Sequence, residues 1–190
     1  YLLTGELEKT NDAYAIAKIA GIKMCESYNI QYKTNYKCLM PTNTFGPNDN
    51  YNALNSHFLP ALIKKVHDLK LNNKKELTLW GNGLAKREVI YVDDLADACI
   101  FFMKKSFSGT TLNIGTGKDF SIKQYAKIIL NKIMPKNKIK IKYDLSKPNG
   151  TPRKVLNIKL ANKYGWKPKT KLDEAITKTY KNFLENNKIV

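Results

Sequence analysis

Long apolar runs, paired cysteines and arginines are all scarce in this chain of 190 residues. No stretch approaches the roughly 18 apolar residues that a membrane-spanning helix needs, and no basic-then-apolar secretory leader is present. We therefore expect no membrane partner. The three cysteines, Cys25, Cys38 and Cys99, lack the spacing of a disulfide framework or a zinc site. We expect them to be buried thiols, with no bound metal, in a reducing, cytoplasmic compartment.

Acidic residues are also few, with 16 aspartates and glutamates against 33 lysines and arginines, a net charge of +17. The positive residues are almost all lysines spread along the whole chain. This distribution favours a compositional bias over a nucleic-acid footprint, so we expect anionic small ligands and no nucleic-acid partner. Arg87 and Arg153 are the only arginines. A guanidinium binds phosphate in a planar, bidentate manner, and the alternative for each arginine is an ordinary surface position.

A glycine loop for dinucleotide phosphates is absent too. Gly81-Asn82-Gly83 and Gly115-Thr116-Gly117 both lack the third glycine of G-x-G-x-x-G, and both are typical of tight turns. Apolar periodicity predicts an α/β chain. Helices are expected at 12–29 (N-cap Asn11 or Asp12), 56–69, 93–105 (N-cap Asp93 or Asp94), 121–134 (N-cap Ser121), 158–164 and 172–186. Strands are expected at 35–42, 76–80, 87–92 and 138–144, a strand and turn at 111–117, and a loop at 42–52.

Tyr14 and Lys18 lie four residues apart on the first expected helix, so their side chains share one face. A nearby ammonium group favours the phenolate form of a tyrosine, which makes the phenol a competent proton donor when a ketone is reduced. Taken alone, the Tyr-x-x-x-Lys spacing is weak evidence, because an exposed lysine beside a half-buried tyrosine is common on helices.

Longer segments carry a resemblance. Ala13–Lys18, followed by Met40–Pro47 (MPTNTFGP), is similar to the extended short-chain dehydrogenase/reductase superfamily. Within it, the chain resembles the GDP-L-fucose synthase family over nearly its whole length, in the segments AGIKMCESYNIQY, PNDNYN, NSHFLPALIKK, WGNGLAKREVIYVDDLA, NIGTG and KPNGTPRK. The resemblance implies the C-terminal part of a Rossmann-type doubly wound parallel sheet plus a smaller α/β substrate-binding domain. Residues 1–50 would belong to the first and 51–190 mostly to the second, with segments around 85–110 returning to the Rossmann sheet.

The resemblance also implies roles for individual residues in 3,5-epimerisation of GDP-4-keto-6-deoxy-D-mannose and reduction of its C4 ketone by NADPH. The catalytic residues would be Tyr14, Lys18 and His57; the cofactor-binding residues Tyr14, Lys18, Pro41, Thr42, Asn43, Thr44 and His57; and the substrate-binding residues Asn43, Lys65, Trp80, Arg87, Asn149 and Lys154. Lys65 replaces the arginine usual in the family and Asn149 the usual aspartate. Without the family, His57 is better explained as a helix-start cap or surface residue. We expect His67 to be structural, and Arg153 is a candidate for a structural role.

In the family, the glycine loop, the active-site Ser/Thr and the epimerisation cysteine all precede the Tyr-Lys helix. We therefore expect these 190 residues alone to bind NADPH poorly and to turn over little substrate. The resemblance also implies a homodimer formed through the Tyr-Lys helix. Two alternatives are another sugar-nucleotide epimerase or dehydratase of the superfamily, and a non-catalytic basic binding module.

Overall fold

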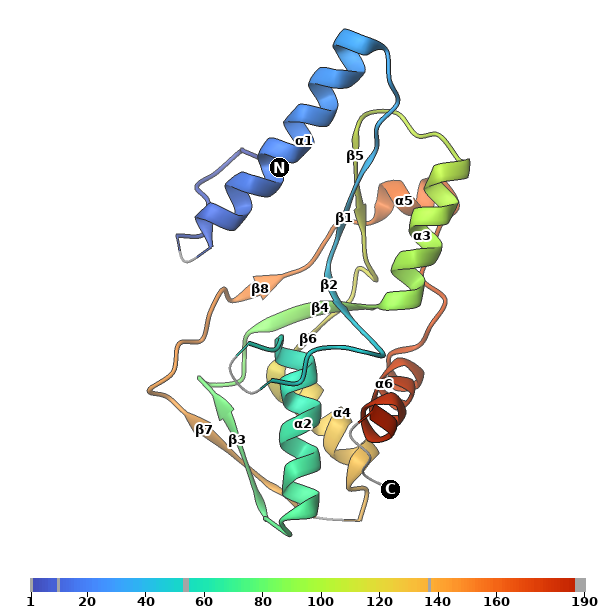
Figure 1. The fold of residues 1–190 in the computed structure, drawn as a ribbon. Coiled ribbons are helices and arrows are strands. Elements are labelled where there is room, and N and C mark those ends of the chain that lie inside the picture. The colour runs from blue at the N-terminus through green and yellow to red at the C-terminus, as the bar shows by residue number, and fades with distance from the viewer. Residues whose placement is uncertain (1, 10, 53–54, 137, 187–190) are drawn as a thin grey trace.

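The computed structural model describes residues 2–9, 11–52, 55–136 and 138–186 (Figure 1). Its helices are α1 (Asp12–Tyr32), α2 (Phe58–Leu71), α3 (Val92–Lys104), α4 (Ile122–Ile133), α5 (Lys159–Lys163) and α6 (Leu172–Asn186). Its strands are β1 (Cys38–Pro41), β2 (Asn43–Phe45), β3 (Glu76–Trp80), β4 (Lys86–Tyr91), β5 (Thr111–Ile114), β6 (Asp119–Ser121), β7 (Lys140–Asp144) and β8 (Arg153–Lys154). Every expected helix is present, with ends shifted by at most a few residues.

The strands form three small sheets that are mostly parallel. β1 pairs with β5 and β3 pairs with β7, both in parallel. Strand β4 is the centre of the third sheet: its last three residues pair in parallel with β2, while its first residues pair with β6 and β8 on either side. The chain from 38 to 45 therefore leaves the first sheet at Pro41 and joins the third at Asn43.

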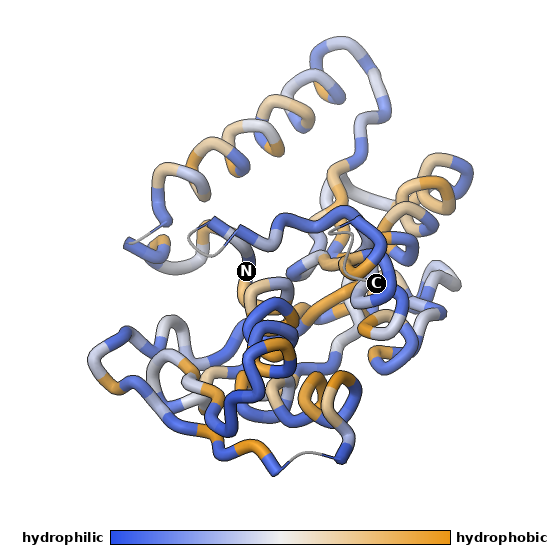
Figure 2. The backbone as a smooth tube through the Cα atoms, turned by 60° about the horizontal axis from the view of Figure 1, so that its bottom comes forward, coloured by the Kyte–Doolittle hydropathy of each residue, from blue (hydrophilic) through white to orange (hydrophobic). Residues whose placement is uncertain are grey.

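Two hydrophobic clusters hold these sheets. The larger cluster packs α2, α4 and α6 against β3 and β4, with residues such as Ile63, Val66 and Ile129 fully buried. The smaller cluster lies between α3, β5 and the segment around α5, and contains Phe102 and Trp166. Figure 2, which colours the chain by hydropathy, shows apolar and polar positions alternating along the helices. The two clusters meet at β4, because Ile90 belongs to one while Val89 and Tyr91 belong to the other.

Helix α1 stands away from this body (Figures 1 and 2). Among its 21 residues only Ile22 is buried. Several of its large apolar side chains are exposed: Tyr14, Ile16, Met24, Tyr28, Ile30 and Tyr32. No helix in the described part of the chain is long and apolar enough to cross a membrane.

Four local predictions were wrong. Helix α3 begins at Val92 after Tyr91, so Asp93 and Asp94 lie inside its first turn and neither is its N-cap. Asp94 is instead buried and accepts hydrogen bonds from Thr170 and Lys169. The region predicted as a loop at 42–52 begins with β2, and β6 and β8 were not predicted. Such short strands have little periodicity of their own and depend on pairing with β4. Cys99 is exposed, and Cys25 and Cys38 are only partly buried.

Candidate functional site

The segment 147–157, which we call the arm, lies along the first residues of β4. Its strand β8 pairs with β4 so that Lys154 stands beside Arg87. The backbone N–H of Lys86 donates to the carbonyl of Pro152 over 2.8 Å. The Arg87 guanidinium donates to the carbonyl of Thr151 over 2.6 Å. These bonds place two positive side chains from distant parts of the sequence next to each other.

Arg87 and Lys154 line one cleft of about 730 Å³ between the arm and the segment before α1. Partial burial lowers the pKa of Arg87 below its usual value, although a guanidinium remains charged at any physiological pH. Because this charge is partly removed from water, it can attract an anion more strongly than a fully exposed lysine can. Glu8, a carboxylate that also lines the cleft, accepts a hydrogen bond from Thr151 Oγ1 over 3.0 Å.

A second group surrounds Trp80 at the end of β3. The indole is 60% exposed, and the Nζ atoms of Lys65 and Lys147 lie 5.2 and 5.7 Å from its ring centroid. Burial lowers the pKa of Lys65. An exposed aromatic face flanked by cations suits a planar ligand that carries negative charge.

Asn149 ties the Trp80 group to the arm. Its Oδ1 accepts a hydrogen bond from the backbone N–H of Asn82 over 2.8 Å. A Cβ atom at Gly81 would collide with that oxygen, and Gly81 also has a φ of +63°. Glycine is therefore favoured at this position for two separate reasons. An aspartate oxygen could accept the same bond, so the Asp-to-Asn departure leaves this anchor intact.

The predicted cofactor loop lies where β1 passes into β2. Thr42 Oγ1 and Asn43 Nδ2 both donate to the carbonyl of Glu88, over 3.1 and 2.8 Å. Thr44 Oγ1 donates to the carbonyl of Thr42. These three side chains therefore hold the loop's shape, while Pro41, the last residue of β1, is exposed.

The predicted catalytic residues lie on two separate elements. On α1, Lys18 Nζ lies 5.4 Å from the Tyr14 ring centroid, so the two share a face as predicted, and Tyr14 is 60% exposed. His57 occupies the N-cap position of α2 without a side-chain capping bond, and it is exposed. Within the described ranges, no hydrogen bond or ion pair joins His57 to Tyr14 or Lys18.

Sequence reasoning missed two acidic residues at the site. Asp119 of β6 forms an ion pair with Arg153, which holds the pKa of that aspartate below its usual value. This ion pair gives Arg153 a partner within the protein, which agrees with the structural role suggested for it from the sequence. Glu88 of β4 is fully buried. The sequence could have indicated this, because Glu88 is the single acidic residue of the expected strand 87–92 and four apolar or aromatic residues follow it. Among the residues that the structure describes, no group of three or more His, Cys, Asp or Glu could hold a metal ion.

Comparisons with known proteins show which sequences and folds this chain is similar to. The chain is 45% identical over 185 residues to a putative GDP-L-fucose synthase 2 of Arabidopsis thaliana, covering 97% of this chain and 56% of the relative. It is 42% identical over 194 residues to the GDP-L-fucose synthase of Escherichia coli, covering 97% of this chain and 60% of the relative. The chain thus spans little more than half the length of these relatives.

A solved structure has the same fold. The crystal structure of a GDP-L-fucose synthetase from Naegleria fowleri bound to NADP matches with a TM-score of 0.87 and 26% identity, over 99% of this chain and 60% of that one. This match confirms the expected α/β class and its Rossmann-type origin. Residues 1–115, more than half of the chain, match the model of the NAD dependent epimerase/dehydratase family, and the chain belongs to that family.

Proposed function

We propose that this chain supplies the substrate-binding and proton-transfer part of a GDP-L-fucose synthase. The complete enzyme would epimerise GDP-4-keto-6-deoxy-D-mannose at C3 and C5 and reduce the C4 ketone with NADPH. The carrying observation is the cleft that Arg87 and Lys154 both line from neighbouring positions on two paired strands. Identities of 42 to 45% to GDP-L-fucose synthases over 97% of the chain support the same activity.

The nucleotide part of the substrate would occupy the cleft and the Trp80 group. Arg87 and Lys154 would bind the pyrophosphate, with the guanidinium offering parallel N–H donors. Trp80 provides an exposed ring, and Lys65 beside it provides charge. A lysine at 65 contacts an anion less directionally than the arginine usual in the family, so the directional contact rests on Arg87. Asn149 would act mainly by holding the turn after Trp80 against the arm.

The reduction needs a proton donor at the C4 oxygen, and Tyr14 would serve as that donor. NADPH, when bound, supplies the hydride. Lys18, on the same face of α1 as Tyr14, would hold the nicotinamide ribose. The segment from Pro41 to Thr44 would lie along the cofactor at the carboxyl ends of β1 and β5, where open α/β sheets bind ligands.

Epimerisation needs a group that exchanges protons next to the ketone. A carbonyl acidifies the C–H bonds at C3 and C5, and an imidazole can carry protons near neutral pH. His57 is exposed at the start of α2 and free of a capping bond, so it is available for that role. The NADP-bound relative supports the cofactor's identity. The cofactor's phosphate cradle would be provided by sequence that the longer relatives have and this chain does not cover.

The remaining assignments follow the same proposal. Residues 1–50 would belong to the cofactor-binding domain and 51–190 mostly to the substrate domain, with the region around 85–110 joining the former sheet. The exposed apolar side chains of α1 would pack against a second copy of the chain in a homodimer. Three free cysteines favour a reducing, cytoplasmic compartment.

A complementation experiment tests the catalytic assignment. The chain would be coexpressed with the N-terminal part of the Arabidopsis relative that it does not cover. NADPH oxidation would then be followed with GDP-4-keto-6-deoxy-D-mannose as substrate. We expect Tyr14→Phe to lower the reduction rate by about 10²- to 10⁴-fold, because only the proton donor is removed. Tyr32→Phe, on the same helix, is the matched control and should keep the parent rate. An unchanged rate in Tyr14→Phe would reject the assignment.

A further inference from the structure

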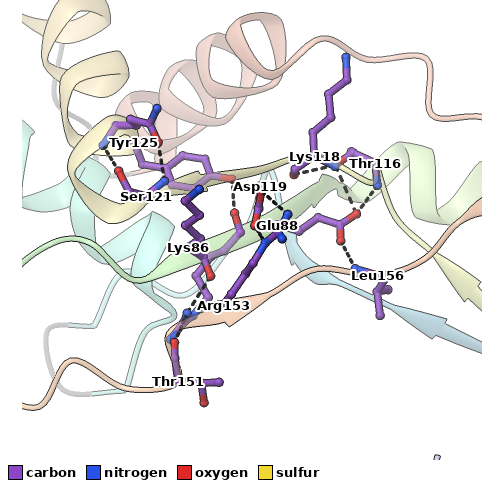
Figure 3. Close-up of polar contacts among 12 residues, drawn as sticks. Lys86, Glu88, Thr116, Lys118, Asp119, Ser121, Tyr125, Thr151, Arg153 and Leu156 are labelled. Atoms are coloured by element: carbon purple, nitrogen blue, oxygen red, sulfur yellow. Dashed lines mark hydrogen bonds and ion pairs between the residues drawn. The ribbon is translucent and has the colours of Figure 1, made fainter. Parts of the chain in front are cut away.

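Glu88 is a fully buried carboxylate that the proposed reaction does not use. It forms no ion pair within the described residues, and backbone N–H groups surround it instead (Figure 3). Its Oε1 accepts from the N–H groups of Thr116 and Gly117 over 2.5 and 2.7 Å. Its Oε2 accepts from the N–H of Leu156 over 2.6 Å. A buried carboxylate needs such hydrogen-bond donors to offset the loss of its contacts with water.

The two carboxylate oxygens serve different parts of the chain. Oε1 holds the turn that follows β5, and Oε2 holds the arm two residues beyond Lys154. Gly115 must be a glycine for this arrangement, because a Cβ atom there would collide with Oε1. The backbone carbonyl of the same glutamate accepts from Thr42 and Asn43 in the predicted cofactor loop. One residue therefore contacts both ligand-binding regions.

The arm needs such an anchor because its own strand is short. β8 has only two residues, Arg153 and Lys154. Before β8, the arm is held by the carbonyls of Thr151 and Pro152. After β8, the bond from Leu156 to Glu88 holds it at the other end. Beyond β8, Asn113 Nδ2 also donates to the carbonyl of Asn157 over 3.3 Å, so the Leu156 bond is the shorter of these two contacts and the nearer to Lys154.

We propose that Glu88 is a positioning residue for phosphate binding: its buried carboxylate holds the arm so that Lys154 and Arg87 face one cleft. This inference rests on the proposed function, since it assumes that the cleft takes the pyrophosphate of a GDP-sugar. Glu88 itself does not touch the ligand. It acts by reducing the freedom of the arm before binding, which lowers the entropy lost when the ligand is bound.

A glutamine at position 88 tests the roles of the two carboxylate oxygens separately, because it keeps one acceptor oxygen and replaces the other with an NH₂ group. In Glu88→Gln, the amide oxygen can still accept from Thr116 and Gly117. The amide NH₂ group would then face the N–H of Leu156, donor against donor. The variant should therefore release the arm and leave the turn in place. Leu156→Pro removes the same N–H from the other side and keeps the carboxylate, so it tests the contact if the glutamine variant folds poorly.

The test uses the full 190-residue chain, with GDP as the probe. Titration calorimetry would measure GDP affinity, and amide hydrogen exchange would measure protection of Leu156, Thr116 and Gly117. For Glu88→Gln we expect at least tenfold faster exchange at Leu156, a much smaller change at Thr116 and Gly117, and about tenfold weaker GDP binding, or roughly 1.4 kcal/mol. Leu156→Pro should weaken GDP binding similarly.

Asp94→Asn is the matched control. Asp94 is also a buried carboxylate that holds a loop through N–H groups, but its loop (Lys169 and Thr170) lies outside the arm. This variant should lose stability while its GDP affinity stays within twofold of wild type. A loss of GDP affinity in Asp94→Asn equal to that in Glu88→Gln would overturn the positioning role, because general destabilisation would then explain both.

The remaining outcomes separate the two proposals. If wild type and both arm variants bind GDP equally well, the positioning role is wrong and the proposed function stands. Protection of Leu156 that persists in Glu88→Gln would also overturn the positioning role. If the wild-type chain binds no GDP, the proposed function of the cleft fails, and the positioning role fails with it.

Discussion

Adjacent residues on β4 have opposite environments. The Arg87 side chain reaches the arm and lines the cleft, whereas the Glu88 carboxylate is fully enclosed. Alternation along a strand explains this difference, because neighbouring side chains point to opposite faces. Tyr125 of α4 also contacts this strand, because its hydroxyl donates a hydrogen bond to the backbone carbonyl of Arg87 over 2.9 Å. The backbone of Arg87 and its guanidinium are thus held by separate contacts, to Tyr125 and to the arm.

His67 is the residue from which we expect a pH effect on stability. It is 3% exposed, its Nδ1 lies 2.9 Å from the Tyr180 hydroxyl, and its ring packs against Phe183. Burial lowers the pKa of His67 below its usual value of 6.5, and the negative charge of Asp68 opposes this only in part. The unfolded chain therefore takes up a proton first as the pH falls, which favours unfolding.

The expected result is a free energy of unfolding that decreases as the pH falls below about 6.5, with a contribution of at most about 1.4 kcal/mol per pH unit. Above that pH the stabilising effect of the neutral imidazole is fully present. Urea unfolding of wild type and His67→Gln between pH 7.5 and 5.5 measures the effect. The variant should show a shallower dependence over this range, and equal slopes would contradict the assignment.

At the scale of single elements, α4 shows how far a local signal can determine structure. Ser121 Oγ accepts from the Gln124 N–H over 3.2 Å, and the Gln124 side chain accepts from the Ser121 N–H over 2.7 Å. This reciprocal capping box confirms the predicted N-cap. The predicted cap of α3 was wrong because the Asp94 carboxylate bonds to a loop 75 or 76 residues away.

Removing the α4 cap should have a measurable cost. We expect Ser121→Ala to lower the free energy of unfolding by about 1 kcal/mol, since a buried end of the helix loses its acceptor. Ser27→Ala is the control, because Ser27 is exposed inside α1 and alanine is the better helix former there. Urea denaturation of the three proteins gives the comparison. A Ser121→Ala variant as stable as wild type would show that the cap is dispensable.

At the scale of the whole molecule, α1 is a long helix with few contacts to the rest of the chain. It has one buried residue, and its exposed apolar side chains lie on more than one side of the helix. Ile16 and Met24 are 56% and 60% exposed. When a helix exposes this many large apolar side chains, the surface is usually an interaction site.

The proposed homodimer predicts that the chain sediments as a dimer at moderate salt, where the repulsion between two +17 chains is screened. The double variant Ile16→Glu, Met24→Glu should sediment as a monomer. Leu145→Glu replaces a more exposed apolar residue (75%) outside α1 and should remain dimeric. Equilibrium sedimentation distinguishes these states. A monomeric wild type, or a dimeric double variant, would contradict assembly through α1.

The sequence by itself determined the helices, the longer strands and the proximity of Tyr14 and Lys18. These features depend on periodicity and on spacings of three or four residues, which act within one element. It also pointed to Arg87, because arginine is so rare in this chain.

Only the tertiary structure decided how the site is assembled. The short strands β2, β6 and β8 exist through pairing with β4, and the partners Arg87–Thr151 and Glu88–Leu156 are separated by 64 and 68 residues. A buried acid in an apolar strand is unfavourable until distant N–H groups converge on it. No local pattern specifies those groups, so the role of Glu88 became visible only when the folded chain brought the turn and the arm to its carboxylate.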